Sequence, residues 1–317
     1  MRIVIDKGIP FLQDVLESVG DVMCLSPEEI TPVILQDADA LFVRTRTQVS
    51  KELLVGSKVR FVATATIGFD HIDQEYCREA GVYWVSCPGC NAQAVCDYVE
   101  EAISSIKSDK NDLTVGVVGY GHVGKLVAQM AQRRGYKVLV SDPPLGIGLS
   151  LKELAWQCDV ITFHTPLTRE GEHVTYHMCD AEVLRLCKDD VLLINAARGG
   201  VLDERALLEY LASEQGTQMK VVIDCWEGEP NLNQELLQKV ELASFHIAGY
   251  SIQGKMNASE MCLRAFCEFF SLPILSINKK AVPLQGDSEA GWLKRISDQL
   301  KVQPKEFEQL RKQYRLR

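Results

Sequence analysis

Short runs of β-branched and other apolar residues alternate along the chain with segments whose apolar positions recur every three or four residues. The runs predict strands, and the segments between them predict helices that bury one face. This alternation is typical of an α/β fold in which helices cover both faces of parallel sheets. The predicted strands form two series: Arg2–Ile5, Ala40–Val43, Arg60–Ala65 and Val82–Val85, then Thr114–Val118, Lys137–Val140, Val160–Phe163, Val191–Ile194 and Lys220–Ile223.

A longer helix is predicted between the two series, over Asn91–Ser108, where apolar residues mark one face. We expect it to cross from one lobe to another. Further on, Met256–Phe270 again has helical periodicity, whereas Leu272–Val282 contains Pro273, is followed by Pro283 and is expected to be a loop. The charged helical tail from Trp292 onward is too short to bury a large core alone. It is expected to pack on the body of the chain or on a second subunit.

Composition narrows the class of protein. The 317 residues are enough for two domains. The net charge is -9, and no block of Lys and Arg interleaved with aromatic residues occurs, which argues against nucleic-acid binding. No apolar run approaches the roughly 20 residues that span a bilayer, and no signal sequence follows Met1. We therefore expect a cytoplasmic protein without membrane contact.

Cysteine and histidine pairs raise the alternative of a metal or redox site. The 11 cysteines are an odd number scattered among apolar positions, which indicates reduced core cysteines rather than a disulfide framework. Cys87 and Cys90 have redox or half-zinc spacing, but no second pair completes a zinc site. His173 and His177 are four residues apart, yet the segment between them is β-prone and carries no Glu. Both pairs are expected to be structural, and no metal is predicted.

The strongest motif is a Gly-x-Gly-x-x-Gly pattern formed by Gly119, Gly121 and Gly124. It follows a predicted strand, opens a predicted helix and is followed by a further strand, which is the setting of a dinucleotide site. Gly119 is expected to make the tight turn, Gly121 to let backbone approach the pyrophosphate, and Gly124 to let the helix pack closely on the sheet. Asp142 ends the next strand, where a carboxylate binds the ribose hydroxyls and repels a 2′-phosphate. The predicted cofactor is NAD rather than NADP.

Three ionisable residues lie just beyond later predicted strands, where α/β sheets bind ligands. Arg198 can hold a substrate carboxylate through two parallel N–H bonds, and His246 can accept an alcohol proton. Glu227 can hold the other ring nitrogen of His246, although Glu229 is an alternative. Together they suit oxidation of a 2-hydroxy acid, with hydride passing to the nicotinamide.

These segments resemble the D-isomer-specific 2-hydroxyacid dehydrogenase family. The resemblance implies an NAD lobe of Rossmann type inserted into a flavodoxin-like substrate lobe, both doubly wound. It assigns the catalytic roles to Arg198, Glu227 and His246. The implied NAD contacts are Gly119, Gly121, His122, Val123, Gly124, Asp142, Thr165, Ala196, Asp224 and Gly249. The implied domains are residues 1–92, completed by about 255–275, for substrate; 93–254 for NAD; and a short C-terminal region, 276–317, that could be a reduced dimerisation domain of a homodimer.

Several segments, above all His246–Lys255, resemble one branch of that family whose substrate is a small phosphorylated 2-hydroxy acid with four carbons. The implied substrate contacts are Thr45, Thr66, Tyr250 and Arg44, and the further candidates for the phosphate are Arg46 and Lys255. Two features depart from the pattern. Phe245 stands where the family usually has Pro, and the C-terminal region is shorter than the resemblance implies.

Two other functions remain open. A related dehydrogenase or reductase acting on 3-phosphoglycerate, glyoxylate or hydroxypyruvate would share the fold and the catalytic residues. An NAD-sensing corepressor-like protein would share the fold without turnover. The complete set of Arg198, Glu227 and His246 favours an enzyme.

Overall fold

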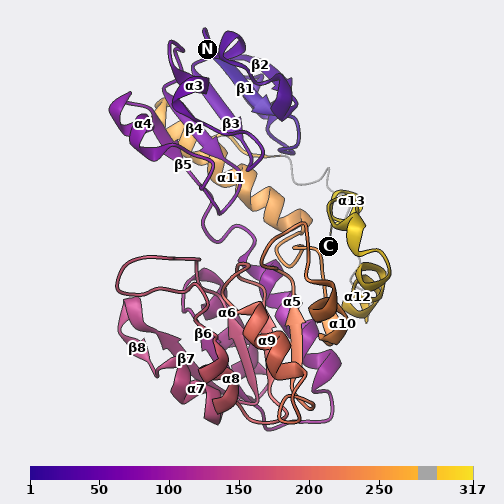
Figure 1. The fold of residues 1–317 in the computed structure, drawn as a ribbon. Coiled ribbons are helices and arrows are strands. Elements are labelled where there is room, and N and C mark those ends of the chain that lie inside the picture. Colours follow the sequence, from indigo (N-terminus) through magenta and orange to yellow (C-terminus); the bar gives the residue numbers. More distant parts are fainter. Residues whose placement is uncertain (278–290, 317) are drawn as a thin grey trace. The chain divides into compact units, whose positions relative to one another are not determined.

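A computed structural model of the chain describes residues 1–277 and 291–316. These residues form two compact units (Figure 1). The first unit contains residues 1–91 and 251–277, and the second contains residues 92–250 and 291–316. Part of the predicted C-terminal region 276–317, and of the predicted loop Leu272–Val282, lies outside the described residues. Residues 291–316 belong to the second unit and not to a region of their own.

The first unit is built on a parallel five-stranded sheet in the order β2-β1-β3-β4-β5. The strands are β1 (Arg2–Asp6), β2 (Asp21–Leu25), β3 (Ala40–Val43), β4 (Phe61–Thr64) and β5 (Tyr83–Val85). The helices are α1 (Gln13–Leu16), the 3-10 turn Pro27–Glu29, α2 (Pro32–Leu35), α3 (Lys51–Leu54), α4 (Gln74–Glu79) and α11 (Ile252–Phe269). The strand order reverses between β1 and β3, which is the place where sheets of this order bind ligands.

Alternation along the strands gives this sheet a core on each face. Ile3 and Ile5 pack in one buried cluster, whereas Val4 between them packs in the other. This period of two is the geometry of a strand. The cluster of Ile3 also contains Leu16 of α1 and Phe266 of α11, so these helices cover that face.

The second unit is built on a seven-stranded sheet in the order β12-β11-β10-β9-β6-β7-β8, which is parallel except for β8. The strands are β6 (Thr114–Val118), β7 (Lys137–Asp142), β8 (Ile147–Gly148), β9 (Val160–Phe163), β10 (Leu192–Asn195), β11 (Lys220–Ile223) and β12 (Leu242–Ala243). The helices are α5 (Ala92–Ile106), α6 (His122–Arg133), the 3-10 turn Pro143–Leu145, α7 (Leu151–Gln157), α8 (Ala181–Leu186), α9 (Glu204–Leu211) and α10 (Gln234–Lys239), then α12 (Trp292–Val302), the 3-10 turn Pro304–Glu306 and α13 (Phe307–Gln313).

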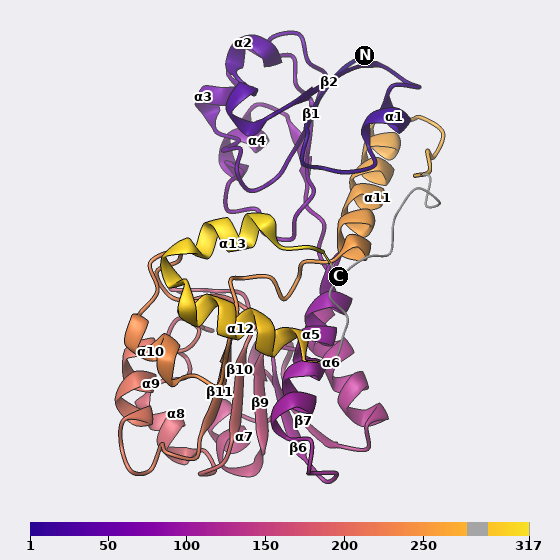
Figure 2. The same cartoon turned by 90° about the vertical axis from the view of Figure 1, so that its right-hand side faces the viewer.

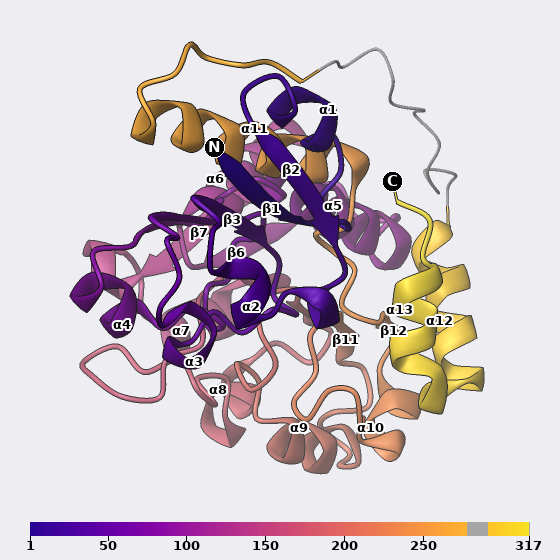
Figure 3. The ribbon, with the colours of Figure 1, turned by 90° about the horizontal axis from the view of Figure 1, so that it is seen from above.

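The C-terminal helices α12 and α13 complete the core of the second unit. Figure 2 shows both helices against this unit, and Figure 3 shows them side by side. The backbone N–H of Ala243 in β12 donates to the Ser297 hydroxyl of α12 at 3.0 Å. Phe307 and Leu310 of α13 are buried in the same apolar cluster as the sheet. The charged tail therefore packs on the body of its own chain.

The predicted α/β fold with two doubly wound parallel-sheet lobes is confirmed. No helix among residues 1–277 and 291–316 combines the length and apolar character that a membrane span needs.

Candidate active site

The glycine motif forms the turn between β6 and α6 of the second unit. Gly119 has φ of +88°, and a Cβ placed there would lie 2.7 Å from the carbonyl oxygen of His164. A Cβ at Gly124 would collide with the carbonyl oxygen of Gly119, because helix and turn are in close contact. A Cβ at Gly121 would meet nothing within 4 Å. Gly119 and Gly124 are thus in close contact with neighbouring backbone, whereas the space beside Gly121 is open.

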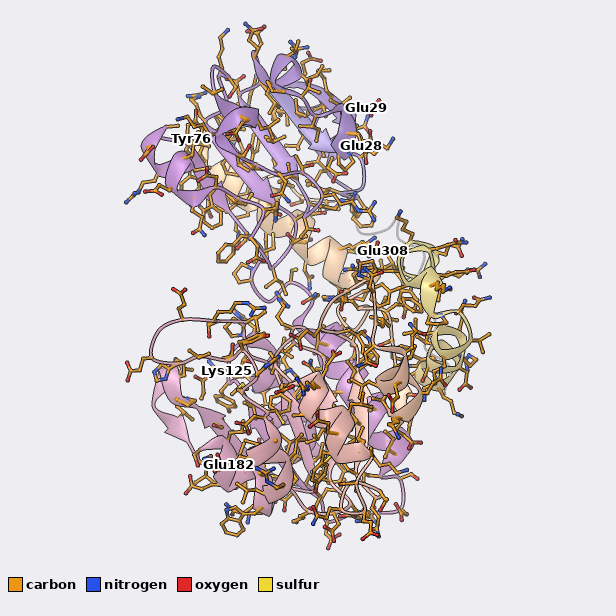
Figure 4. The ribbon with its side chains drawn as sticks, in the orientation of Figure 1. Glu28, Glu29, Tyr76, Lys125, Glu182 and Glu308 are labelled. Atoms are coloured by element: carbon orange, nitrogen blue, oxygen red, sulfur yellow. The ribbon has the colours of Figure 1, made fainter. Side chains whose placement is uncertain are left out.

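Helix α6 begins at His122 directly after this open position. Its N-cap is Gly121, which has no side chain to bond the first N–H groups, and its first turn carries no acidic residue. Free N–H groups and the positive end of the helix dipole suit a phosphate. Val123 also lies in the first turn of α6. Lys125 of the same helix is labelled in Figure 4. These features fit the pyrophosphate of a dinucleotide.

Asp142 stands at the end of β7 and contacts the glycine turn. Its carboxylate accepts the Tyr120 N–H at 2.6 Å and the Leu145 N–H at 3.2 Å. The sheet order reverses between β6 and β9, and dinucleotides bind at this kind of reversal. Thr165 follows β9 and is half-buried, while Ala196 follows β10 and is buried.

Asp224 organises the loop that carries His246. It is fully buried, and Oδ1 accepts the Ser244 hydroxyl at 2.6 Å and the Ile247 N–H at 2.7 Å. Oδ2 accepts the Ala248 N–H at 2.9 Å, and the Asp224 carbonyl accepts the His246 N–H at 3.0 Å. These bonds hold His246 at a positive φ of 58°. The described contacts of Asp224 are therefore with the protein, and its predicted NAD contact stays a prediction.

Asn195 joins the Arg198 loop to the loop after β11. Its amide donates to the carbonyl oxygens of Arg198 at 3.0 Å and Cys225 at 3.1 Å. A Cβ at Gly199 would collide with the Trp226 carbonyl, so the two loops touch. Arg198 is half-buried, and its Nη1 donates to the Ala197 carbonyl at 2.8 Å. The remaining guanidinium donors can bind a carboxylate.

His246 is paired with Glu229, which corrects the predicted pairing with Glu227. Its Nδ1 lies 2.9 Å from Oε2 and 3.2 Å from Oε1 of Glu229. Oε1 also accepts the Trp226 N–H at 2.8 Å, which orients the carboxylate. With Nδ1 occupied, Nε2 is the ring nitrogen left for a substrate proton.

Glu227 bonds a different histidine. Its carboxylate lies 3.0 and 3.1 Å from Nε2 of His177, and Oε1 accepts the Tyr176 hydroxyl at 3.1 Å. The physical reason is the turn at Gly228, which has φ of +83° and separates the two carboxylates. The Glu227 N–H donates to Glu204. Burial, opposed by this hydrogen bond and reinforced by Glu227 and Glu229, raises the pKa of Glu204 to about 7.

The surroundings of His246 favour its protonated form. Burial alone lowers the pKa of His246, but Cys225 and the Glu229 carboxylate outweigh burial and raise that pKa well above its ordinary value. We attribute the increase chiefly to Glu229, because burial raises the pKa of the Cys225 thiol and keeps it neutral. A histidine with this environment suits the exchange of a proton with an alcohol oxygen.

The first unit places its predicted substrate residues at the carboxyl ends of β3 and β4. Arg44 forms two bonds of 2.9 Å with the buried Asp6, so most of its charge is offset. Thr45 and Arg46 are exposed. The Thr66 hydroxyl donates to the Gly68 carbonyl at 2.9 Å and lies 2.7 Å from that of Thr64.

Lys255, in the first turns of α11, is half-buried. No hydrogen bond or ion pair of its ammonium group is found within the described ranges. Burial and the nearby charge of Arg44 lower the pKa of Lys255. Lys255 is a cation suited to an anionic ligand.

Tyr250 lies in the His246 loop and belongs to the second unit, as does the half-buried Gly249. Its N–H donates to the Ile247 carbonyl at 2.8 Å, which makes a tight turn after His246. Its hydroxyl accepts a bond of 3.1 Å from Nε of Arg311 in α13. The sequence alone did not connect Arg311 with this loop.

Comparisons with known proteins place the chain in a family. The model of the D-isomer-specific 2-hydroxyacid dehydrogenase NAD-binding domain matches residues 97–248. An erythronate-4-phosphate dehydrogenase of Bacteroides fragilis is 42% identical over 100% of this chain and 97% of its own length. The chain belongs to the D-isomer-specific 2-hydroxyacid dehydrogenase family.

Two further proteins are similar to the chain. An erythronate-4-phosphate dehydrogenase of Cronobacter sakazakii is 37% identical over 100% of this chain and 92% of its own length. The NAD⁺-bound 3-phosphoglycerate dehydrogenase of Entamoeba histolytica is 25% identical over 88% of this chain and 99% of its own, with a TM-score of 0.71. The chain is accordingly an oxidoreductase with an NAD-binding domain.

The predicted structural pairs of cysteines and histidines have different environments in the structure. Cys87 and Cys90 are buried in the first unit, where the Cys87 thiol lies 3.4 Å from that of Cys262. His177 is hydrogen-bonded to Glu227, and His173 is exposed. No group of metal-binding side chains is found within residues 1–277 and 291–316.

Proposed function

We propose that the protein oxidises 4-phospho-D-erythronate to (R)-3-hydroxy-2-oxo-4-phosphooxybutanoate with NAD, a step of pyridoxal 5′-phosphate biosynthesis. The observation that supports this most is the His246–Glu229 pair in the same unit as a glycine turn suited to a dinucleotide. The substrate follows the relatives of 36–43% identity, which are erythronate-4-phosphate dehydrogenases.

The chemistry follows from the side chains. Arg198 binds the substrate carboxylate, which places the adjacent C2 hydroxyl toward His246. Nε2 of His246 accepts the hydroxyl proton, and Glu229 stabilises the resulting imidazolium through Nδ1. NAD, when bound by the glycine turn and Asp142, supplies the acceptor for the hydride from C2. Glu227 is not one of these proposed catalytic residues, because its carboxylate is hydrogen-bonded to His177.

A panel of acids tests the substrate. The protein is expected to oxidise 4-phosphoerythronate with a kcat/KM about tenfold to a hundredfold above that for erythronate, since a charged hydrogen bond to phosphate contributes about 1.5–3 kcal/mol. The measurement is NADH absorbance with 4-phosphoerythronate, erythronate and 3-phosphoglycerate at matched concentrations.

Three results of this panel would contradict the proposal. Equal rates on erythronate and its phosphate would exclude a phosphate-binding site. A preference for 3-phosphoglycerate would assign the related dehydrogenase activity. No turnover of any acid, with NADH still bound, would favour the NAD-sensing alternative.

Cofactor choice is tested at Asp142. NAD is expected to be strongly preferred over NADP, because the Asp142 carboxylate binds ribose hydroxyls and repels a 2′-phosphate. Asp142→Ala is expected to narrow this preference, because it weakens the binding of NAD. The ratio of kcat/KM for the two cofactors measures the effect. Asp142 also accepts the Tyr120 N–H, so Asp142→Asn serves as the control that keeps the side-chain size. Equal use of both cofactors by the unmodified protein would contradict the assignment.

In the first unit, Lys255 is the better candidate for the phosphate than Arg44. Arg44 is held by Asp6, and its removal would leave a buried carboxylate unpaired. Thr45 and Thr66 offer hydroxyls to the sugar-acid oxygens.

We further propose a cytoplasmic homodimer. The location is supported by the buried free cysteines, and the dimer rests only on the resemblance to the family.

A further inference from the structure

The last described helix, α13, is anchored beside the His246 loop. Phe307 and Leu310 of this helix are buried in the core of the second unit. The ring of Tyr314, just beyond α13, lies edge-on to that of Phe245 at 6.0 Å. Phe245 immediately precedes His246, so the C-terminal segment contacts the loop that carries the proton acceptor. Figure 4 labels Glu308 on this helix.

Arg311 extends from α13 to Tyr250. Its Nε donates to the Tyr250 hydroxyl oxygen at 3.1 Å, and its guanidinium carbon lies 5.5 Å from the centre of that ring. The side chain is 26% exposed, and Nη1 lies 3.5 Å from the partly exposed carboxylate of Glu308. An ion pair at this distance and exposure contributes little. No described hydrogen bond uses Nη2.

The surroundings of Arg311 stabilise the charge that a guanidinium always carries. Burial alone lowers the pKa of Arg311, but Tyr250 and then Glu229 outweigh burial and raise it. Arg311 thus lies within electrostatic range of the carboxylate that holds His246. In contrast to Arg44, whose partner Asp6 is fully buried, Arg311 has within the described residues an ion pair only with the partly exposed Glu308.

The direction of the Arg311–Tyr250 hydrogen bond leaves Nη2 of Arg311 and the hydroxyl group of Tyr250 available as donors. A guanidinium has only N–H donors, so the Tyr250 oxygen must accept. The Tyr250 hydroxyl hydrogen is then free to be donated elsewhere. An Arg nitrogen and a phenol O–H side by side match a tetrahedral oxyanion, for which Arg is well suited by its planar fork.

We propose that Arg311 and Tyr250 bind the substrate phosphate, so that the C-terminal helix determines specificity for a phosphorylated acid. This inference rests on the proposed function. Arg198 serves the carboxylate from a different loop, after β10, which leaves the second anionic end of a phosphorylated four-carbon acid to be bound elsewhere. Arg311 and Tyr250 meet that need within the unit that holds His246.

The test compares Arg311→Gln with Lys312→Gln, which removes a positive charge from the next, exposed residue of the same helix. Arg311→Gln is expected to lower kcat/KM for 4-phosphoerythronate by about tenfold to a hundredfold and that for erythronate by less than about threefold. Lys312→Gln should change neither by more than about twofold. Inorganic phosphate is expected to inhibit the oxidation of 4-phosphoerythronate less strongly in Arg311→Gln than in the unmodified protein or in Lys312→Gln. This comparison does not depend on the rate at which erythronate is oxidised.

Several outcomes would overturn the inference. Equal losses with both acids would make Arg311 a structural support of the loop, and unchanged kinetics would remove it from the site. Arg311→Lys separates folding from recognition, because it keeps the charge; it should melt like the unmodified protein and retain part of the phosphate preference. If the unmodified protein does not oxidise 4-phosphoerythronate, the proposed function fails instead.

Discussion

His246→Ala is expected to lower kcat for the oxidation of the 2-hydroxy acid by about 10²–10⁴-fold, because it removes the group that accepts the alcohol proton. Binding of NADH should change by less than about twofold, since the glycine turn and Asp142 belong to other loops. The measurements are steady-state rates by NADH absorbance and NADH affinity by fluorescence titration.

His177→Ala is the matched control for this variant. His177 is also half-buried and also bonds a glutamate, but that glutamate is Glu227. Its activity should stay within about threefold of the unmodified protein. Activity of His246→Ala within a few-fold of normal would mean that His246 is structural and that another group takes the proton.

The strands could largely be predicted because their apolar runs are buried on both faces of parallel sheets. Thr114–Val118, Val160–Phe163 and Lys220–Ile223 have the predicted bounds. β2, Asp21–Leu25, was missed although Val22–Leu25 are all apolar, because it is a partly exposed edge strand in which only Val22 is β-branched. β12 was missed because only two residues form it.

The position of the C-terminal helices could not be decided from the sequence. A charged tail with a few apolar residues can cover its own chain or a partner, and its pattern does not distinguish the two. The structure buries Phe307 and Leu310 against the second unit. The contact between Arg311 and Tyr250 joins residues 61 positions apart, and no periodicity connects them.

The choice between Glu227 and Glu229 also lies beyond sequence patterns. Both follow β11 in an irregular turn, where neither helical nor strand spacing says which side a residue faces. The left-handed conformation of Gly228 directs them to different partners, His177 and His246. The structure thus pairs His246 with Glu229 and not with Glu227, and the catalytic roles of Arg198 and His246 stay predictions.

Glu229→Gln is therefore expected to lower kcat by at least about tenfold, whereas Glu227→Gln should change it by less than about threefold. The amide introduced at position 229 could still bond Nδ1 but could not stabilise the imidazolium by charge. The pKa of His246, which Glu229 raises, should fall in this variant. The measurements are pH profiles of kcat/KM for oxidation and for the reverse reduction.

The sign of the pH shift distinguishes proton transfer from a structural defect. Oxidation needs neutral His246, so its rate rises with pH through the pKa of His246; reduction needs the protonated form and falls through the same pKa. In Glu229→Gln both midpoints should move to lower pH, while Glu227→Gln should leave them in place. A loss of activity without this shift would show that Glu229 only shapes the loop. A shift in Glu227→Gln instead would restore Glu227 as the partner of His246, since a carboxylate raises the pKa of a histidine most when it is hydrogen-bonded to the ring.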